Sequence, residues 1–226
     1  GGYMAAHLAR AGVDVSVVAR GEHLAAIRRD GLRFIGHDGE FTVRVAASDR
    51  PADLGPQDLV ISTLKAHGLP PAASSMRALL GPDTPVVFAV NGIPWWYLAD
   101  LRGGDSSASR LDPDGTLARE LGLARTLGCV IRSPNEVVAP GVVRNNSRAS
   151  SFVVGEPGGA LSPRLERVVA LMRRGLPGAA ATLDIGREIW GKLLLNVPSS
   201  LLSRLTQSPS SGLLGDPATR ELYARL

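Results

Sequence analysis

The spacing of hydrophobic positions changes near the start of the chain. From Gly1 to Ala11 the small and apolar residues recur at helical spacing, and Gly12 is a typical residue for ending a helix. The segment 13–20, VDVSVVAR, alternates and is rich in β-branched residues, which predicts a strand. The chain therefore begins with a predicted helix followed directly by a predicted strand.

Two apolar runs further along predict buried parallel strands. Residues 58–65 are largely apolar and end in polar side chains, and residues 84–92 repeat this pattern. A crossover helix is predicted between them, over 69–80. Because the carboxyl ends of parallel strands share one edge of a sheet, we expect Lys65 and Asn91 at that edge. A solvated lysine and a turn-forming Asn-Gly pair are the alternative interpretations.

Other patterns predict a β-hairpin, a surface loop, a series of short strands and a helix, over residues 32–46, 102–115, 129–155 and 162–174. The helix has Ser162 as its expected N-cap and Pro163 at its first position. The alternation of strands and helices predicts an α/β fold with a doubly wound parallel sheet.

A long helix with a polar stripe is predicted over residues 184–202. Its apolar face contains Ile185, Ile189, Leu193 and Leu194. Polar side chains recur every four residues beside that face, at Glu188, Lys192, Asn196 and Ser200. Since polar groups in apolar surroundings need partners, a bound ligand is one interpretation and an exposed Glu188–Lys192 ion pair is the other. Pro198 is expected to kink or end the helix, so Ser200 is less securely placed than Asn196.

Composition and charge exclude several classes of protein. The hydrophobic content of 44% is ordinary for a globular protein, and neither a membrane span nor a signal peptide is visible, which predicts a cytoplasmic protein with no membrane partner. The single cysteine, Cys129, excludes an internal disulfide and a cysteine-based zinc site, and we expect it to be buried and no metal to be bound. The net charge of +4 is not gathered into basic runs with aromatic residues, so no nucleic-acid partner is expected.

Lysine is rare among the basic residues. Of the 25 lysines and arginines only Lys65 and Lys192 are lysines. A guanidinium stays protonated in proteins, whereas an ammonium group can donate a proton. The two lysines are therefore candidates for chemistry that arginine cannot perform, although two could also persist by chance.

The opening helix and strand fit the second half of a dinucleotide-binding βαβ unit. Gly1 would then be the third glycine of the G-x-G-x-x-G fingerprint. Arg20, at the end of the predicted strand, suits the extra phosphate of NADP. Glu22 is the competing candidate and would favour NAD, and a plain surface arginine is the third interpretation.

Four segments, in this order, resemble the ketopantoate reductase (2-dehydropantoate 2-reductase) family. They are GGYMAAHLARAG at 1–12, TLKA at 63–66, VNGIPWW at 90–96 and EIWGKLLLN at 188–196. The first segment alone is weak evidence, but the ordered set is specific and spans nearly the whole chain.

The resemblance implies a Rossmann-type NADP-binding domain over residues 1–182 and the start of an all-helical substrate domain over 183–226. The implied reaction is reduction of 2-dehydropantoate to pantoate by NADPH, as in pantothenate and coenzyme A biosynthesis. By resemblance, Lys192 is the general acid that protonates the ketone oxygen. The other implied site residues are Asn91, Asn196 and Ser200 for substrate, and Gly1, Arg20, Lys65 and Asn91 for the cofactor.

The sequence also departs from the family pattern. Ser200 stands where many members have a second substrate-binding asparagine, which leaves room for another 2-oxo acid. The first strand of the Rossmann domain, its first two phosphate-loop glycines and the later helices with a serine and a glutamate for substrate are missing. The chain is therefore expected to be a fragment, truncated at both ends, that folds poorly and does not turn over by itself.

Several alternatives remain open at this point. A non-catalytic NADP-binding module is the rival from another functional class, and a homodimer is one candidate assembly of the full-length protein. Trp95 and Trp96 either line a distinct substrate pocket or pack in the core.

Overall fold

The computed structural model describes residues 1–97, 111–208, 212 and 215–225. It divides into two compact units, Gly1–Ile185 and Gly186–Leu226. The fold is α/β, with a Rossmann-type domain followed by helices, as predicted. Most of the predicted surface loop at 102–115 lies outside the described residues.

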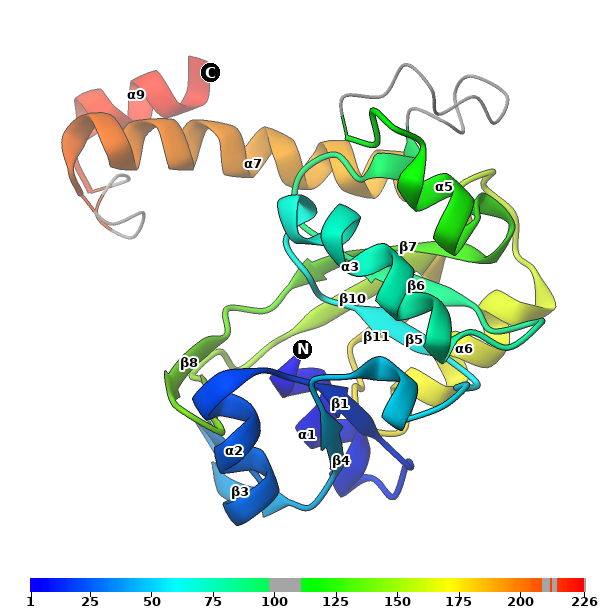
Figure 1. Cartoon of the computed structure of the whole chain (residues 1–226). Coiled ribbons are helices and arrows are strands. Elements are labelled where there is room, and N and C mark those ends of the chain that lie inside the picture. Colours follow the sequence, from blue (N-terminus) through cyan, green and yellow to red (C-terminus); the bar gives the residue numbers. More distant parts are fainter. Residues whose placement is uncertain (98–110, 209–211, 213–214, 226) are drawn as a thin grey trace. The chain divides into compact units, whose positions relative to one another are not determined.

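The main sheet of the first unit has five strands in the order β11-β10-β7-β6-β5 (Figure 1). Their bounds are Val60–Ser62 (β5), Val86–Ala89 (β6), Thr126–Arg132 (β7), Ser151–Gly155 (β10) and Ala179–Thr182 (β11). All neighbours run parallel except β7 and β10, which are antiparallel. All four residues of β6 are buried, so both faces of the sheet are covered, as in a doubly wound fold.

The helices of this unit connect and cover the strands. Their bounds are Gly2–Arg10 (α1), Gly21–Asp30 (α2), Leu69–Met76 (α3), Thr116–Leu121 (α5) and Pro163–Arg173 (α6). Short 3₁₀ turns occupy Pro51–Asp53 (η1), Ala66–Gly68 (η2), Arg77–Leu79 (η3) and Leu123–Arg125 (η4). The crossover helix predicted over 69–80 thus ends as an α-helix at Met76 and tightens into η3.

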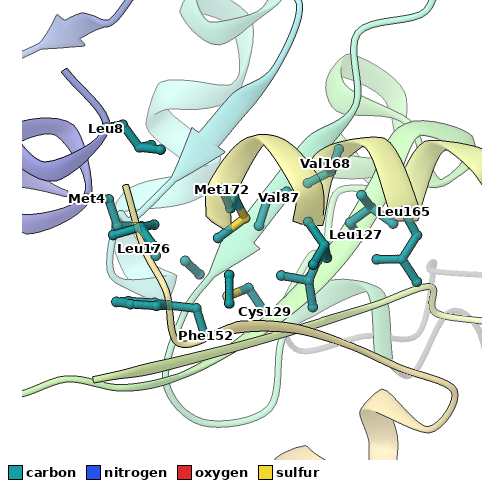
Figure 2. Close-up of a cluster of buried hydrophobic side chains, with 14 residues drawn as sticks. Met4, Leu8, Val87, Leu127, Cys129, Phe152, Leu165, Val168, Met172 and Leu176 are labelled. Carbon is teal, nitrogen blue, oxygen red and sulfur yellow. The ribbon is translucent and has the colours of Figure 1, made fainter. Parts of the chain in front are cut away.

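One core cluster lies between the sheet and helices α1 and α6. Figure 2 shows side chains of α6 directed at those of the central strands, with Met172 and Leu127 among them. Phe152 of β10 and Cys129 of β7 are buried in the same cluster, so the expectation of a buried cysteine is confirmed. The helix spacing of α6 places its four buried residues on one face, which fixes that face against the sheet.

Two strands form a separate parallel pair in the first unit. These are β1 (Ser16–Val18) and β4 (Ala46–Ser48), with Ser16 opposite Ala46 in the register. Among the described residues β1 pairs only with β4, and β5 pairs along its length only with β6 (Figure 1). Within the described part of the chain, β1 and β4 thus form a sheet of their own, and one edge of β1 and one edge of β5 have no strand paired with them.

A four-stranded sheet combines two hairpins in the order β3-β2-β9-β8. Their bounds are Leu32–Gly36 (β2), Gly39–Val43 (β3), Glu136–Ala139 (β8) and Val142–Asn145 (β9). The predicted hairpin at 32–46 is thereby confirmed as β2 and β3. Another core cluster contains Leu32, Phe34 and Val143 together with Ala6 of α1. Helix α1 thus packs on both of these clusters, because Met4 and Leu8 belong to the one beneath α6.

The start of α6 is tied to the end of β10. The Oγ of Ser162 accepts a hydrogen bond from the backbone N–H of Leu165 at 3.1 Å, which confirms the predicted N-cap. Ser162 also donates to the buried carboxylate of Glu156, and Arg164 forms an ion pair with that carboxylate at 2.5 Å. Burial alone would raise the pKa of Glu156, but the hydrogen bonds from Arg164 and Ser162 lower it overall.

In the second unit the structure describes α9 (Pro217–Arg225) and most of α7 (Ile185–Thr206). Helix α7 continues through Pro198, so of the two expected outcomes, a kink or an end of the helix, the end is wrong. Its apolar side chains are largely exposed, including Leu194, Leu195 and Leu205. None of the described helices has a stretch long and apolar enough to cross a lipid bilayer.

Candidate active site

Lys65 and Asn91 follow neighbouring parallel strands at equal distances. Ser62, the last residue of β5, lies opposite Phe88 of β6 in the register. Lys65 is three residues beyond Ser62, and Asn91 is three residues beyond Phe88. Both residues are exposed, at the carboxyl edge of the sheet where open α/β sheets bind ligands.

The N-terminus of α1 lies against the same edge. Gly1 is the N-cap residue of α1, and a Cβ at this position would lie 2.6 Å from the Oγ1 of Thr63, which follows β5. A Cβ on Gly2 would lie 2.5 Å from a methyl group of Val143. Glycine at both positions thus lets the start of α1 lie close to Thr63 and Val143, and close helix–strand packing is the role of the third glycine in a dinucleotide-binding fingerprint.

This end of α1 fits a phosphate group. No side chain caps the helix, and its first turn contains no acidic residue. The N–H groups of a first turn and the helix dipole favour an anion. The Oγ of Ser62 is buried nearby on β5 and has no hydrogen-bond partner among the described residues. Uncapped N–H groups and an unpartnered buried hydroxyl are what a nucleotide-binding edge would supply.

Arg20 lies two residues beyond the end of β1 and is the N-cap residue of α2. Its side chain is exposed, and no side chain caps α2 either. Glu22 lies in the first turn of α2 and is also exposed. Arg20 and Glu22, the candidates for selecting NADP and NAD, thus both lie at the start of α2.

Helix α7 brings the other predicted residues onto one face of the second unit. Lys192 and Asn196 are one helical turn apart and half-buried, and Ser200 follows one turn later and is exposed. These three residues lie in a different unit from Lys65 and Asn91.

The backbone of α7 is supported around Pro198. The proline has no N–H for the carbonyl of Leu194, four residues earlier. The Oγ of Ser199 donates to the carbonyl of Leu195 at 2.8 Å, and the hydroxyl of Tyr223 in α9 donates to the same carbonyl at 3.0 Å. Side-chain hydroxyl groups therefore reinforce the helix between Lys192 and the proline.

Trp95 and Trp96 are packing residues rather than pocket walls. Their exposed fractions are 2% and 1%, and Trp95 packs edge-on against Phe88 with ring centroids 5.6 Å apart. The alternative in which they line an open substrate pocket is therefore not supported. No group of three or more His, Cys, Asp or Glu side chains is arranged to hold a metal ion within residues 1–97, 111–208, 212 and 215–225.

Comparison with known proteins identifies the family. The family described as "Ketopantoate reductase PanE/ApbA" matches residues 1–95. A 2-dehydropantoate 2-reductase of Mesorhizobium japonicum is 41% identical over 98% of this chain, which spans 69% of that protein. The chain belongs to the ketopantoate reductase family. The predicted resemblance is confirmed.

Solved structures agree with this assignment. A protein of Ralstonia solanacearum MolK2 described as a ketopantoate reductase superposes with a TM-score of 0.88 at 38% identity, over 97% of this chain and 68% of that one. The 2-dehydropantoate 2-reductase of Geobacter metallireducens GS-15 gives a TM-score of 0.81 at 27% identity, over 98% and 67% of the two chains.

Some residues of this ketopantoate reductase family member were not singled out by sequence reasoning. Ser62 and Thr63 lie at the strand end beside Gly1, yet only Lys65 of that segment was chosen as a site residue. Their position directly after a buried apolar run, at the expected ligand edge, was the signal available. Hydroxyl side chains are too common at strand ends for that signal to be decisive.

Proposed function

We propose that this protein reduces a 2-oxo acid with NADPH, and that 2-dehydropantoate, which would yield pantoate for pantothenate and coenzyme A biosynthesis, is the first substrate to test. The observation that carries the proposal is the pair Lys192 and Asn196, one turn apart on α7, in a member of the ketopantoate reductase family. In this proposal residues 1–182 hold the cofactor and residues 183–226 begin the substrate domain.

Lys192 is the proton donor in the proposed reaction. NADPH, when bound, supplies a hydride to the carbonyl carbon of the 2-oxo acid. The ammonium group of Lys192 gives a proton to the carbonyl oxygen, which becomes the hydroxyl of the product, and Lys192 is then reprotonated from solvent. A general acid placed in this way accelerates a reaction by about 10²–10⁴-fold. Arginine could not replace it, because a guanidinium does not release its proton.

The remaining residues bind and orient. The side-chain amides of Asn91 and Asn196 and the hydroxyl of Ser200 are assigned to the nicotinamide and substrate. Gly1 and the first turn of α1 are assigned to the pyrophosphate, with Lys65 beside them. Arg20 is assigned to the phosphate that distinguishes NADP from NAD, and a bidentate guanidinium–phosphate pair suits that role.

Ser200 supports an alternative substrate within the same chemistry. A serine hydroxyl is shorter than an asparagine amide and offers one donor where the amide offers two. A binding site with serine at this position favours a 2-oxo acid with a larger or less polar side chain than ketopantoate. The reaction and the role of Lys192 would be unchanged.

The test is an assay of NADPH oxidation with the complete gene product. The substrates are ketopantoate and a panel of 2-oxo acids with small, branched and aromatic side chains, and the matched variant is Lys192→Ala. We expect turnover with at least one 2-oxo acid and its loss in Lys192→Ala, with NADPH affinity retained. We also expect the 226-residue chain by itself to show no turnover.

The outcomes separate the candidates. The best substrate decides between 2-dehydropantoate and another 2-oxo acid. Turnover that survives in Lys192→Ala would remove Lys192 from the mechanism. Tight NADPH binding with no turnover on any 2-oxo acid would replace the reductase by a non-catalytic binding module. Equal rates with NADH and NADPH would contradict the role given to Arg20 and favour Glu22.

A further inference from the structure

Strands β1 and β4 end side by side, and an arginine follows each of them at the same distance (Figure 1). Val18, the last residue of β1, lies opposite Ser48, the last residue of β4, in the parallel register. Arg20 is two residues beyond Val18, and Arg50 is two residues beyond Ser48. Both arginines are exposed. Since paired strands lie about 5 Å apart, the two arginines belong to chain segments that are close neighbours where the strands end.

The two connections after these strands are built alike. The backbone N–H of Ala19 donates to the carbonyl of Ser48 at 3.1 Å, so β1 stays bonded to the end of β4 up to the residue before Arg20. Arg20 is the N-cap residue of α2, and Arg50 is the N-cap residue of η1. The backbone of both arginines is extended. Arg20 and Arg50 thus occupy equivalent places at the carboxyl edge of adjacent parallel strands.

The guanidinium of Arg50 is oriented by Asp53. Its Nε donates to the Oδ2 of Asp53 at 3.1 Å, and its Nη2 lies 3.0 Å from the Oδ1. The Oδ2 of Asp53 also accepts a hydrogen bond from the Oγ of the buried Ser48 at 2.7 Å. That Oγ in turn accepts a hydrogen bond from the backbone N–H of Arg50 at 3.1 Å. Asp53 is therefore bonded to the strand end, and the Arg50 side chain is bonded to Asp53.

These contacts leave part of the Arg50 guanidinium for another anion. An arginine side chain has five N–H donors, and Asp53 takes the one on Nε and one on Nη2. The remaining donors lie on Nη1 and Nη2, and two of them form the edge that binds a phosphate group through two parallel hydrogen bonds. An exposed ion pair contributes little to stability. The arrangement therefore favours a role of Arg50 in binding over a role in folding.

The place of the two arginines indicates which anion they fit. In a dinucleotide-binding unit, the 2′ position of the adenosine ribose lies at the end of the second strand, and arginine there accommodates the phosphate of NADP. A phosphate monoester carries nearly two negative charges at neutral pH. Each arginine also has an exposed acidic neighbour, because Glu22 follows Arg20 by two residues and Asp49 precedes Arg50. Neither arginine alone thus makes a strongly positive site, and the two together match the phosphate better.

We propose that Arg50 is a second residue that determines the specificity for NADPH, and that it binds the 2′-phosphate of the cofactor together with Arg20. In this proposal Asp53 and Ser48 are positioning residues, because they act through Arg50. The inference rests on the proposed use of NADPH, and all of its residues belong to the first unit. The dinucleotide fingerprint gives this role to the end of the second strand alone, so Arg50 was not among the predicted site residues.

The first test compares the affinities for two cofactors that differ only in this phosphate. Dissociation constants for NADPH and NADH are measured with the complete gene product by titration of cofactor fluorescence. In Arg50→Gln we expect the constant for NADPH to rise by about 10- to 100-fold and that for NADH to stay at the wild-type value. The matched control is Arg33→Gln, which breaks another exposed ion pair of the first unit, with Glu40, and should change neither constant. An unchanged affinity for NADPH in Arg50→Gln would overturn the proposal.

The second test isolates the phosphate from the rest of the cofactor. Calorimetry compares adenosine 2′,5′-bisphosphate with AMP, which lacks the 2′-phosphate. The wild type should prefer the bisphosphate, Arg20→Gln and Arg50→Gln should each reduce that preference, and the double variant should bind both ligands equally. An equal loss for the two ligands in Arg50→Gln would assign Arg50 to the adenine or the ribose and overturn the proposal. Inorganic phosphate should compete with the bisphosphate in the wild type but not in the double variant, and competition that survives in the double variant would place the phosphate elsewhere.

A further variant covers the case in which Arg50→Gln does not fold, which its urea midpoint reports. Arg50→Lys keeps the charge but lacks the paired donors, so we expect weaker binding of NADPH and unchanged binding of NADH. Wild-type affinity for NADPH in Arg50→Lys would overturn the proposed contact. A wild type that binds NADPH tightly but reduces no 2-oxo acid would refute the proposed reaction, and the affinities above would still decide the role of Arg50. A wild type that binds NADPH no more tightly than NADH would overturn both this inference and the proposed cofactor.

Discussion

Helices α6 and α7 both present many apolar side chains, but in different surroundings. In α6 the apolar residues keep to one face, and Leu165, Val168 and Met172 are buried against the sheet. In α7 apolar residues occur all round the helix, and Leu194, at 69% exposed, is among several that are open in the described structure. The residue assigned as the proton donor is on α7.

The two helices are therefore expected to differ in how much they contribute to the stability of the fold. A helix whose apolar stripe is buried contributes to the free energy of unfolding, at about 25 cal/mol for each Å² of apolar surface removed from water. A helix that exposes its apolar side chains contributes little, so its sequence is open to other demands. We therefore expect substitutions of the buried face of α6 to act on folding and those of the polar stripe of α7 to act on turnover.

The largest expected effect tests the chemical side of this comparison. Lys192→Arg keeps the positive charge and most of the length but removes the ability to release a proton. We expect kcat to fall by about 10²–10⁴-fold while the urea midpoint stays at the wild-type value. Steady-state kinetics and equilibrium unfolding of the complete gene product give the two numbers. Activity close to the wild type would mean that Lys192 acts only as a charge.

The next prediction concerns the two helices directly. Met172→Ala removes a fully buried side chain from α6, and a Met-to-Ala change in a core costs about 2–5 kcal/mol. Leu194→Ala on α7 removes an exposed side chain, and we expect a change within about 0.5 kcal/mol. Urea unfolding of both variants measures the contrast. A cost for Leu194→Ala as large as that for Met172→Ala would show that the complete protein buries this face of α7.

Periodicity predicted the elements well where packing follows sequence spacing. The cap at Ser162, the hairpin at 32–46 and the strands ending near Lys65 and Asn91 all rest on local patterns. The family assignment came from ordered motifs and is confirmed by the comparisons.

Long-range contacts could not be predicted from the sequence. The register that pairs Gly128 with Gly155 depends on how β7 meets β10, and no local pattern encodes it. Burial of Trp95 and Trp96 was likewise open, because an aromatic pair after Asn-Gly suits a pocket as well as a core. Pro198 predicted a kink or an end of the helix by a local rule, yet α7 does not end there. The hydroxyl groups of Ser199 and Tyr223 donate to the carbonyl of Leu195, next to the carbonyl that the proline leaves without a backbone donor.

A smaller effect on the free energy of unfolding is expected when the ion pair between Glu156 and Arg164, at the start of α6, is broken. Glu156→Gln leaves Arg164 without its charged partner, although Arg164 still donates to the carbonyls of Ala124 and Thr126. We expect the free energy of unfolding to fall by about 1–2 kcal/mol. This is less than for a fully buried pair, because the Arg164 side chain is partly exposed.

The pH dependence of stability checks this ion pair. The pKa of Glu156 is lowered in the folded state, so its stabilisation is present above the unfolded value of about 4.3 and is lost as the pH falls through the folded pKa. Across this range, the free energy of unfolding should vary less with pH for Glu156→Gln than for the wild type. The same variation with pH in both proteins would show that Glu156 is not responsible for the loss of stability in acid.

The smallest expected effect comes from two histidines of the first unit. Burial lowers the pKa of His7, and the charge of Arg10 lowers it further, while burial lowers the pKa of His23, whose Nδ1 accepts a hydrogen bond from Gly141 at 2.9 Å. The folded state then binds fewer protons than the unfolded state, so stability falls as the pH drops from about 6.5 towards the folded pKa values. We expect a total loss below about 1 kcal/mol, because water still screens both rings.

Replacing both His7 and His23 tests whether they cause the loss of stability below about pH 6.5. The variant His7→Gln with His23→Gln should unfold at the same urea concentration above and below pH 6.5 (about the ordinary pKa of histidine), whereas the wild type should lose stability on the acid side. The two other histidines, His37 and His67, serve as the matched control when they are replaced instead. If the variant without His7 and His23 kept the wild-type change of stability with pH, and the variant without His37 and His67 lost it, the change would belong to the exposed histidines instead. In that case the first unit would owe none of its pH dependence to the small core in which His7 packs against Phe34.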